Sequence, residues 1–188
     1  LAIGVPAAYA LAPRPGRTSR VLEEFISLPL AVPGLAIALA LLQVYGTWKG
    51  FRMHWSFILV GHVLYTLPFM IRSVVAVLAT IDLNPLEEGA ATLGAPPARR
   101  FFDIVLPNAM PGILAGALTV VTLSIGEFNL TWMLHTPFTK TLPVGLADSY
   151  ASMRLEIASA YTLIFFVMIV PLLMAMQWAS TRARKITP

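Results

Sequence analysis

The sequence contains no cysteine, which excludes disulfide bonds and thiolate metal sites. Charge is also scarce, because only 12% of the 188 residues are Asp, Glu, Lys or Arg, against about 25% in soluble domains. So few charges cannot cover a surface that faces water, and 57% of the residues are hydrophobic. The composition therefore predicts a membrane protein.

Other absences narrow the function. The basic residues form no clustered face of the kind that binds nucleic acid, so no nucleic-acid partner is expected. The histidines at positions 54, 62 and 135 are too scattered to indicate a metal site. There is no G-x-x-x-x-G-K-[ST] run, so the chain is not expected to hold nucleotide itself. We expect no cofactor, no catalytic residue and no enzymatic activity in this chain.

Long apolar runs are what the sequence does contain. A membrane-spanning helix needs about 20 mostly apolar residues, and four runs reach that length. The chain opens on a shorter apolar stretch with no charged segment before it, which we interpret as the end of a helix whose start is missing. The predicted spans cover residues 1–12 in part, 25–46, 55–79, 109–134 and 157–179.

The predicted fold class is all-α: a polytopic transmembrane helical bundle of about five passes, truncated at its N-terminus. The apolar runs are continuous rather than alternating, so a membrane barrel is not expected. Residues 1–188 form a single predicted transmembrane domain. Gly112 and Gly116 lie four residues apart, a spacing that allows another helix to approach closely.

The distribution of lysine and arginine indicates the orientation. If the spans alternate, eight basic residues lie on one side and four on the other, leaving out Arg72 within a span. Cytoplasmic loops carry the excess of Lys and Arg, so the side with eight is predicted to be cytoplasmic. The eight are Arg14, Arg17, Arg20, Arg99, Arg100, Arg182, Arg184 and Lys185.

A polar segment, residues 84–107, interrupts the apolar runs on this predicted cytoplasmic side. Asn84 is a good N-cap, and Pro85 suits the first position of a helix. Glu87 then falls at the third position, where a capping-box carboxylate reaches back to the cap. The segment therefore predicts a short helix that begins at Asn84.

The same segment contains a predicted turn and a second helix. Gly94 is a natural left-handed helix terminator, and the prolines at 96 and 97 prevent simple continuation. A second short helix is predicted from Pro97, with Pro107 opening the next span. Local chemistry alone leaves two interpretations of this hairpin: a solvated amphipathic loop, or a docking element for a soluble partner.

The spacing of the hairpin resembles a known motif. Glu88-Gly89-Ala90 is followed after three residues by Gly94, and after nine more by Ile104-x-Leu106-Pro107. This pattern is similar to the EAA loop in permease subunits of type I binding-protein-dependent ABC importers. Gly89 departs from it, since the family usually has Ala there.

The resemblance extends over nearly the whole chain. The runs "AYALA", "LPLAVPG", "GEFNLTWML" and "TKTLPVGL" are similar to successive parts of these permeases. The nearest branch carries polyamines, ferric iron, phosphonates, sulfate or thiamine. The cargo implied is a small polar or charged solute, of polyamine, phosphonate or ferric iron type.

The resemblance implies a complex in the bacterial cytoplasmic membrane. This chain would form half of the solute pathway, with a second permease subunit that is identical or homologous. Cytoplasmic ABC ATPase subunits would grip the hairpin, and an extracytoplasmic solute-binding protein would deliver cargo. The implied coupling residues are Glu87, Glu88, Gly89, Ala90, Gly94, Ala95, Arg99, Arg100, Ile104, Leu106 and Pro107.

Ionisable and polar residues within the spans are candidates for the solute pathway. Glu127 lies 20 residues past Pro107, roughly 30 Å along a helix, and so near the outer mouth. Its alternative role is an interfacial carboxylate bonded to Asn129 or Thr131. The candidate pathway residues are Glu127, Asn129, His62 and Tyr65.

Two other functions compete with that of an importer subunit. An ATP-independent secondary transporter or channel would need intramembrane ion sites or inverted repeats, and no convincing repeat is visible. A membrane scaffold that transports nothing is the second alternative. The sequence does not identify the cargo.

Overall fold

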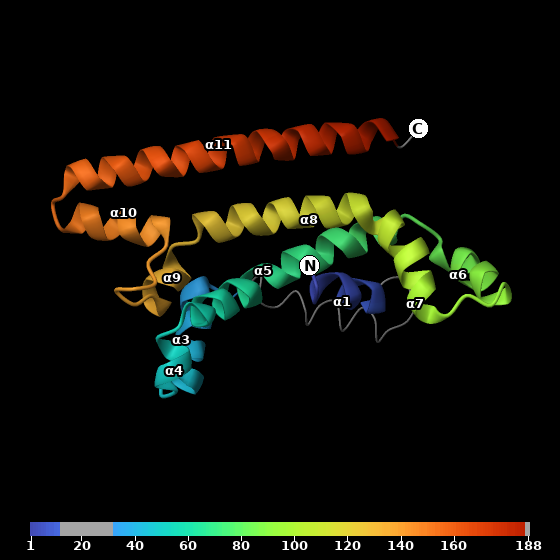
Figure 1. Cartoon of the computed structure of the whole chain (residues 1–188), viewed down its shortest axis with the longest axis horizontal. Helices are drawn as coiled ribbons and strands as arrows, with labels where there is room; N and C mark the ends of the chain where they lie inside the picture. Colours follow the sequence, from blue (N-terminus) through green and yellow to red (C-terminus); the bar gives the residue numbers. More distant parts are fainter. Residues whose placement is uncertain (12–31, 187–188) are drawn as a thin grey trace. The chain divides into compact units, whose positions relative to one another are not determined.

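The computed structural model describes residues 1–11 and 32–186, with side chains as far as Trp178. Every regular element in these residues is helical, which confirms the all-α prediction (Figure 1). In chain order the elements are α1 (Gly4–Leu11), α3 (Gly34–Tyr45), α4 (Lys49–Arg52), α5 (Trp55–Leu78), α6 (Leu83–Thr92), α7 (Pro97–Arg100), the π-helical turn η1 (Phe101–Val105), α8 (Leu106–Gly126), α9 (Asn129–Leu134), α10 (Leu142–Ala151) and α11 (Leu155–Ile186).

Three helical stretches of the described residues are long and apolar enough to cross a membrane. They are Trp55–Leu78, Pro97–Gly126 and Leu155–Trp178. The helix α3 is apolar but has only 12 residues, and the first part of the predicted span 25–46 lies outside the described residues. The basic loop with Arg14, Arg17 and Arg20 and the side chains of the C-terminal tail lie outside them too. Five passes therefore stay a prediction.

The predicted second helix of the hairpin and the span after it are one continuous helical stretch, Pro97–Gly126. Pro107 lies in the first turn of α8 and no break in the helix precedes it, so the start of the span at Pro107 stays a prediction. Pro107 has no N–H to donate, and the turn just before it is wider than an α-turn: the N–H of Leu106 donates to the carbonyl of Phe101. The Asn108 side chain donates to the Ile104 carbonyl at 2.7 Å.

The predicted span 109–134 is not one continuous helix, and its bounds stay a prediction. The helix α8 ends at Gly126, and α9 begins at Asn129. In a continuous α-helix the N–H groups of Leu130 and Thr131 would bond to carbonyls four residues earlier. Here they donate to the Glu127 carboxylate instead, at 2.9 and 3.0 Å. The side chain of Glu127 thus replaces two backbone acceptors and allows the break.

The described residues form two compact units, and the single domain predicted over 1–188 stays a prediction. The first unit contains 1–11, 67–119 and the end of α11. Within it, α8 lies directly on α5: a Cβ added at Gly112 would be 2.7 Å from the Ser73 carbonyl oxygen, and one at Gly116 2.7 Å from the Met70 sulfur. The close approach predicted for Gly112 and Gly116 is confirmed.

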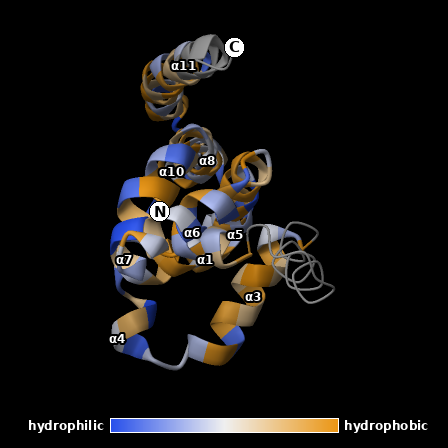
Figure 2. Ribbon diagram, turned by 90° about the vertical axis from the view of Figure 1, so that its right-hand side faces the viewer, coloured by the Kyte–Doolittle hydropathy of each residue, from blue (hydrophilic) through white to orange (hydrophobic). Residues whose placement is uncertain are grey.

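The second unit contains residues 32–66 and 120–178. Its core is a cluster of buried apolar side chains from α3, α5 and α9, and Figure 2 shows α3 coloured as hydrophobic along most of its length. Gly61 lets α9 approach α5, because a Cβ there would be 2.7 Å from Leu134 and 2.8 Å from Leu130. The core residues are Ala38, Leu41, Phe57, Leu130 and Leu134.

Candidate functional site

The first arm of the hairpin is α6, and it begins earlier than the sequence predicts. Its N-cap is Asp82 and its first residue is Leu83, whose side chain is only 2% exposed. Asn84 is therefore within the first turn rather than the cap, and Glu87 is not at the third position. No side chain caps α6, so the predicted capping box is wrong. Burial of Leu83 favours a helix that already includes this residue.

The turn of the hairpin is the one that the sequence predicts. Gly94 has φ of +80°, which is the left-handed region that glycine enters without a steric penalty. Its N–H donates to the Ala91 carbonyl at 2.9 Å, and the N–H of Ala95 donates to the Ala90 carbonyl at 3.0 Å. This pair of bonds is the Schellman motif. It closes α6 and satisfies two carbonyls at its end.

The second arm begins at Pro97, as predicted, with Pro96 as the N-cap. Arg99 lies 3.8 Å from Asp103 one turn later, and both side chains are mostly exposed. Exposed pairs of this kind contribute little to stability. The guanidinium of Arg99 is therefore accessible to a partner.

The exposed surface of the hairpin is a mixture of charge and apolar side chains. Glu88 and Gly89 are exposed, and Leu93, beside the turn, is 89% exposed. Glu87 is only half-exposed, and its carboxylate accepts a hydrogen bond from the Tyr9 hydroxyl of α1 at 2.5 Å. The two adjacent glutamates therefore have different surroundings.

A polar network lies in the second unit, centred on Glu127. This residue is 8% exposed, and its carboxylate accepts from the N–H groups of Leu130 and Thr131 and from the Thr131 hydroxyl, the last at 3.2 Å. A carboxylate at a helix start is stabilised by the free N–H groups there. At the other end of α9, Arg52 donates to the Leu134 carbonyl at 2.8 Å. Of the two bonding partners considered for Glu127, Thr131 is the one observed.

His62 of α5 extends this network. Its Nε2 is 2.7 Å from the Thr131 hydroxyl, and its Nδ1 is 2.7 Å from the Ser124 hydroxyl. Because the Thr131 hydroxyl donates to Glu127, Nε2 carries the hydrogen toward Thr131. In the neutral imidazole Nδ1 then accepts from Ser124. One chain of hydrogen bonds thus runs from Ser124 to Glu127.

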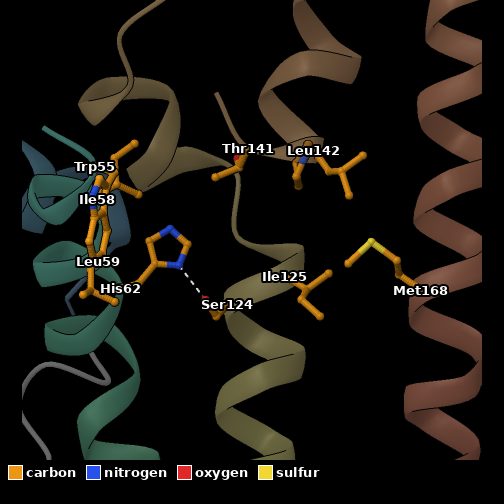
Figure 3. Close-up of a pocket in the computed structure, with 10 residues that line it drawn as sticks. Trp55, Ile58, Leu59, His62, Ser124, Ile125, Thr141, Leu142 and Met168 are labelled. Carbon is orange, nitrogen blue, oxygen red and sulfur yellow. Dashed lines mark hydrogen bonds between the residues drawn. The ribbon is translucent and has the colours of Figure 1, made fainter. Parts of the chain in front are cut away.

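The network borders a cavity of about 360 Å³ in the second unit. Figure 3 shows His62 and Ser124 side by side at this cavity, joined by their hydrogen bond, with Thr141 and Leu142 across from them. The other walls are apolar. They are formed by Trp55, Ile58, Leu59, Ile125, Pro143 and Met168.

The four predicted pathway residues do not form one site. His62 and Glu127 are joined through Thr131, whereas Asn129 is exposed and Tyr65 packs against the apolar core. Ser124 was not among the pathway residues predicted from the sequence. Its signal was its position three residues before Glu127 in an apolar run.

A family model described as "Binding-protein-dependent transport system inner membrane component" matches residues 2–185. The chain belongs to this family. The permease is also similar to curated proteins of the same kind. The molybdenum transport system permease protein ModB of Haemophilus influenzae is 28% identical over 98% of this chain and 87% of its own length. ModB of Escherichia coli K12 is 31% identical over 69% of this chain and 62% of its own length.

A third relative is named for a different solute. The putative 2-aminoethylphosphonate transport system permease protein PhnV of Salmonella typhimurium is 28% identical over 97% of this permease and 69% of its own length. The names of these three relatives refer to molybdenum and a phosphonate. Polyamine and ferric iron, two of the expected cargo types, have no counterpart among them, and molybdenum was not among those types.

A solved structure supports the fold. The MetNI methionine ABC transporter, in inward-facing conformations, superposes with a TM-score of 0.72 at 18% identity, over 100% of this chain and 87% of that chain. The permease therefore has the fold of an ABC importer permease. Its function as a permease of such a transport system follows from the family.

Proposed function

We propose that this permease forms half of the solute pathway of an ATP-driven importer in the bacterial inner membrane, as a multi-pass subunit. Its partners are a second permease subunit, cytoplasmic ABC ATPase subunits and an extracytoplasmic solute-binding protein. ATP hydrolysis belongs to the ATPase subunits. The cargo is a small oxyanion of molybdate or phosphonate type, a class supported by the names of the relatives.

The hairpin from α6 to α7 carries this proposal. It has the EAA spacing, a rigid Schellman turn at Gly94, and an exposed Glu88 with an exposed Leu93 beside the turn. A polar element with an apolar tip suits insertion into a cleft of a soluble subunit. We propose that Glu88, Gly89, Ala90, Gly94 and the arm to Pro107 couple to the ATPase. Arg99 and Arg100 would add positive charge at that contact.

We also propose that the cavity beside His62 and Ser124 belongs to the solute pathway. The Thr141 hydroxyl in its wall has no hydrogen-bond partner among the described residues and can donate to an oxyanion, whereas His62 and Ser124 bond to each other. Glu127 lies behind them and holds Thr131 in place. Tyr65 and Asn129 are not among the residues that line this cavity.

The test is uptake by vesicles that contain the permease with its ATPase and binding protein. We expect ATP-dependent import of molybdate or 2-aminoethylphosphonate, and loss of import in Glu88→Lys and Gly94→Trp variants that still insert into the membrane. Both variants should also lose the ATPase subunit on purification. Import that persists without ATP would favour a secondary transporter or channel. Full ATP-coupled import by both variants would contradict the role of the hairpin.

A further inference from the structure

The end of α1 touches both arms of the hairpin through one side chain. The Tyr9 hydroxyl donates to Oε1 of Glu87 in α6 at 2.5 Å. The ring of Tyr9 lies 5.5 Å, centroid to centroid, from the ring of Phe101, in the second arm. All three residues lie in the first compact unit, and Figure 1 shows α1 ending beside α7.

This hydrogen bond gives the adjacent residues Glu87 and Glu88 different surroundings. Successive residues of an α-helix point about 100° apart, so only one of them can face α1. Glu87 does so and is half-buried, whereas Glu88 is exposed. A hydroxyl that donates to a carboxylate forms a charge-assisted hydrogen bond, which is stronger than a bond between neutral groups.

The rest of α1 is fixed to the helices that follow. Val5 and Ala8 are buried, and a Cβ added at Gly4 would be 2.8 Å from Cγ of Met70 in α5. Met70 in turn lies against Gly116 of α8. A path of direct contacts therefore runs from the hairpin through Tyr9 and α1 to α5 and α8.

We propose that Tyr9 is a positioning residue that ties α1 to the coupling hairpin, with Glu87 as its acceptor. Displacement of the hairpin then moves α1 with it, and Glu88 is left free to meet the ATPase. The inference rests on the proposed function, because the hairpin is displaced only if an ATPase grips it. It assigns Glu87 to a contact within the permease rather than to the interface.

The test is the amount of solute imported per ATP hydrolysed, measured in the same vesicles. Tyr9→Phe removes the hydroxyl and keeps the ring against Phe101. We expect import per ATP to fall about threefold or more, since a hydrogen bond to a charged group is lost, with the ATPase still bound. Tyr150→Phe is the matched control, because Tyr150 is 67% exposed and lies in the other unit. It should keep the wild-type ratio.

Variants of Glu87 provide an independent measurement. Glu87→Ala should lower the ratio as Tyr9→Phe does, whereas Glu87→Gln keeps an acceptor oxygen and should restore part of it. The double variant Tyr9→Phe/Glu87→Ala should be no worse than the poorer single variant, because one bond is removed in each case.

The outcomes separate the two proposals. Wild-type vesicles that import with ATP, together with an unchanged ratio in Tyr9→Phe and Glu87→Ala, would overturn the role of Tyr9 alone. A double variant whose loss equals the sum of the two single losses would also overturn it. Wild-type vesicles that import neither oxyanion with ATP would overturn the proposed function itself.

Discussion

Glu127 has a structural role at the start of α9 that its position in an apolar run does not indicate. Its carboxylate accepts three hydrogen bonds and is nearly buried. Removal of a buried acceptor leaves the donors unsatisfied, which costs more than the bond itself contributes. The break between α8 and α9 therefore depends on this side chain.

Glu127→Gln should lower the free energy of unfolding by about 1–3 kcal/mol, because the amide turns an NH₂ toward one of the backbone donors. Thermal or denaturant unfolding of the purified permease in detergent measures the change. Glu88→Gln is the control: its side chain is exposed, so the change should stay within about 0.5 kcal/mol. Equal effects of the two substitutions would contradict the capping role.

Asp148 in α10 offers a prediction about pH. The hydrogen bond and the charge of Lys140 lower the pKa of this carboxyl below its ordinary value of 3.8. A carboxyl whose pKa is depressed by folding stabilises the protein above that ordinary value. The contribution is lost as the pH falls through the folded pKa.

Lys140→Gln should raise the pKa of Asp148 toward its ordinary value, with Arg154 and His135 continuing to lower it slightly by their charge. Carbon NMR of labelled aspartate, followed against pH, measures this. The pair is exposed, so the fold should survive the substitution. A pKa of Asp148 that stays equally low without Lys140 would show that another group holds it.

At the scale of elements, the hairpin contains two glycines whose substitution should have opposite effects. A Cβ at either Gly89 or Gly94 would meet nothing within 4 Å. The effect of each substitution on stability therefore depends only on the backbone conformation. Gly89 lies inside α6, where alanine is better than glycine by about 0.5–1 kcal/mol. Gly94 has φ of +80°, where a Cβ costs about 1–2 kcal/mol.

Gly89→Ala should therefore slow hydrogen exchange of the α6 amides, and Gly94→Ala should accelerate it. Mass spectrometry of the exchanged hairpin peptides measures both in one experiment. Each variant is the control for the other, because both substitutions add the same methyl group. Faster exchange in Gly89→Ala would mean that α6 is held by something other than its helical propensity.

At the scale of the whole molecule, orientation in the membrane is the property to test. The absence of cysteine makes the permease suited to labelling at single introduced thiols. Leu93, beside the hairpin turn, and Phe138, between α9 and α10, are both 89% exposed. The proposal places them on opposite sides of the membrane.

A membrane-impermeant maleimide should label Phe138→Cys in cells whose outer membrane has been permeabilised, and Leu93→Cys only in inverted inner-membrane vesicles. The two variants control for each other, since the reagent and the exposure are the same. Labelling of Leu93→Cys from outside would place the hairpin away from ATP. The coupling proposal would then fail.

Features that depend on composition and on local backbone conformation can be predicted from the sequence. Scarce charge and long apolar runs predict helices for a membrane. Gly94 and Pro97 predict the turn and the start of the second arm, because a positive φ and a missing N–H restrict the chain at those positions. The spacing around Glu88 was enough to indicate the family.

Contacts between distant residues could not be predicted and became known from the packing of the helices. The helix α6 begins at Leu83, which is buried, and not after Asn84. Glu87 accepts a hydrogen bond from Tyr9, 78 residues away, instead of capping its own helix. His62 and Thr131 are 69 residues apart and meet in one network. Such pairs depend on how helices pack, and no periodicity within a single helix specifies the partner across the interface.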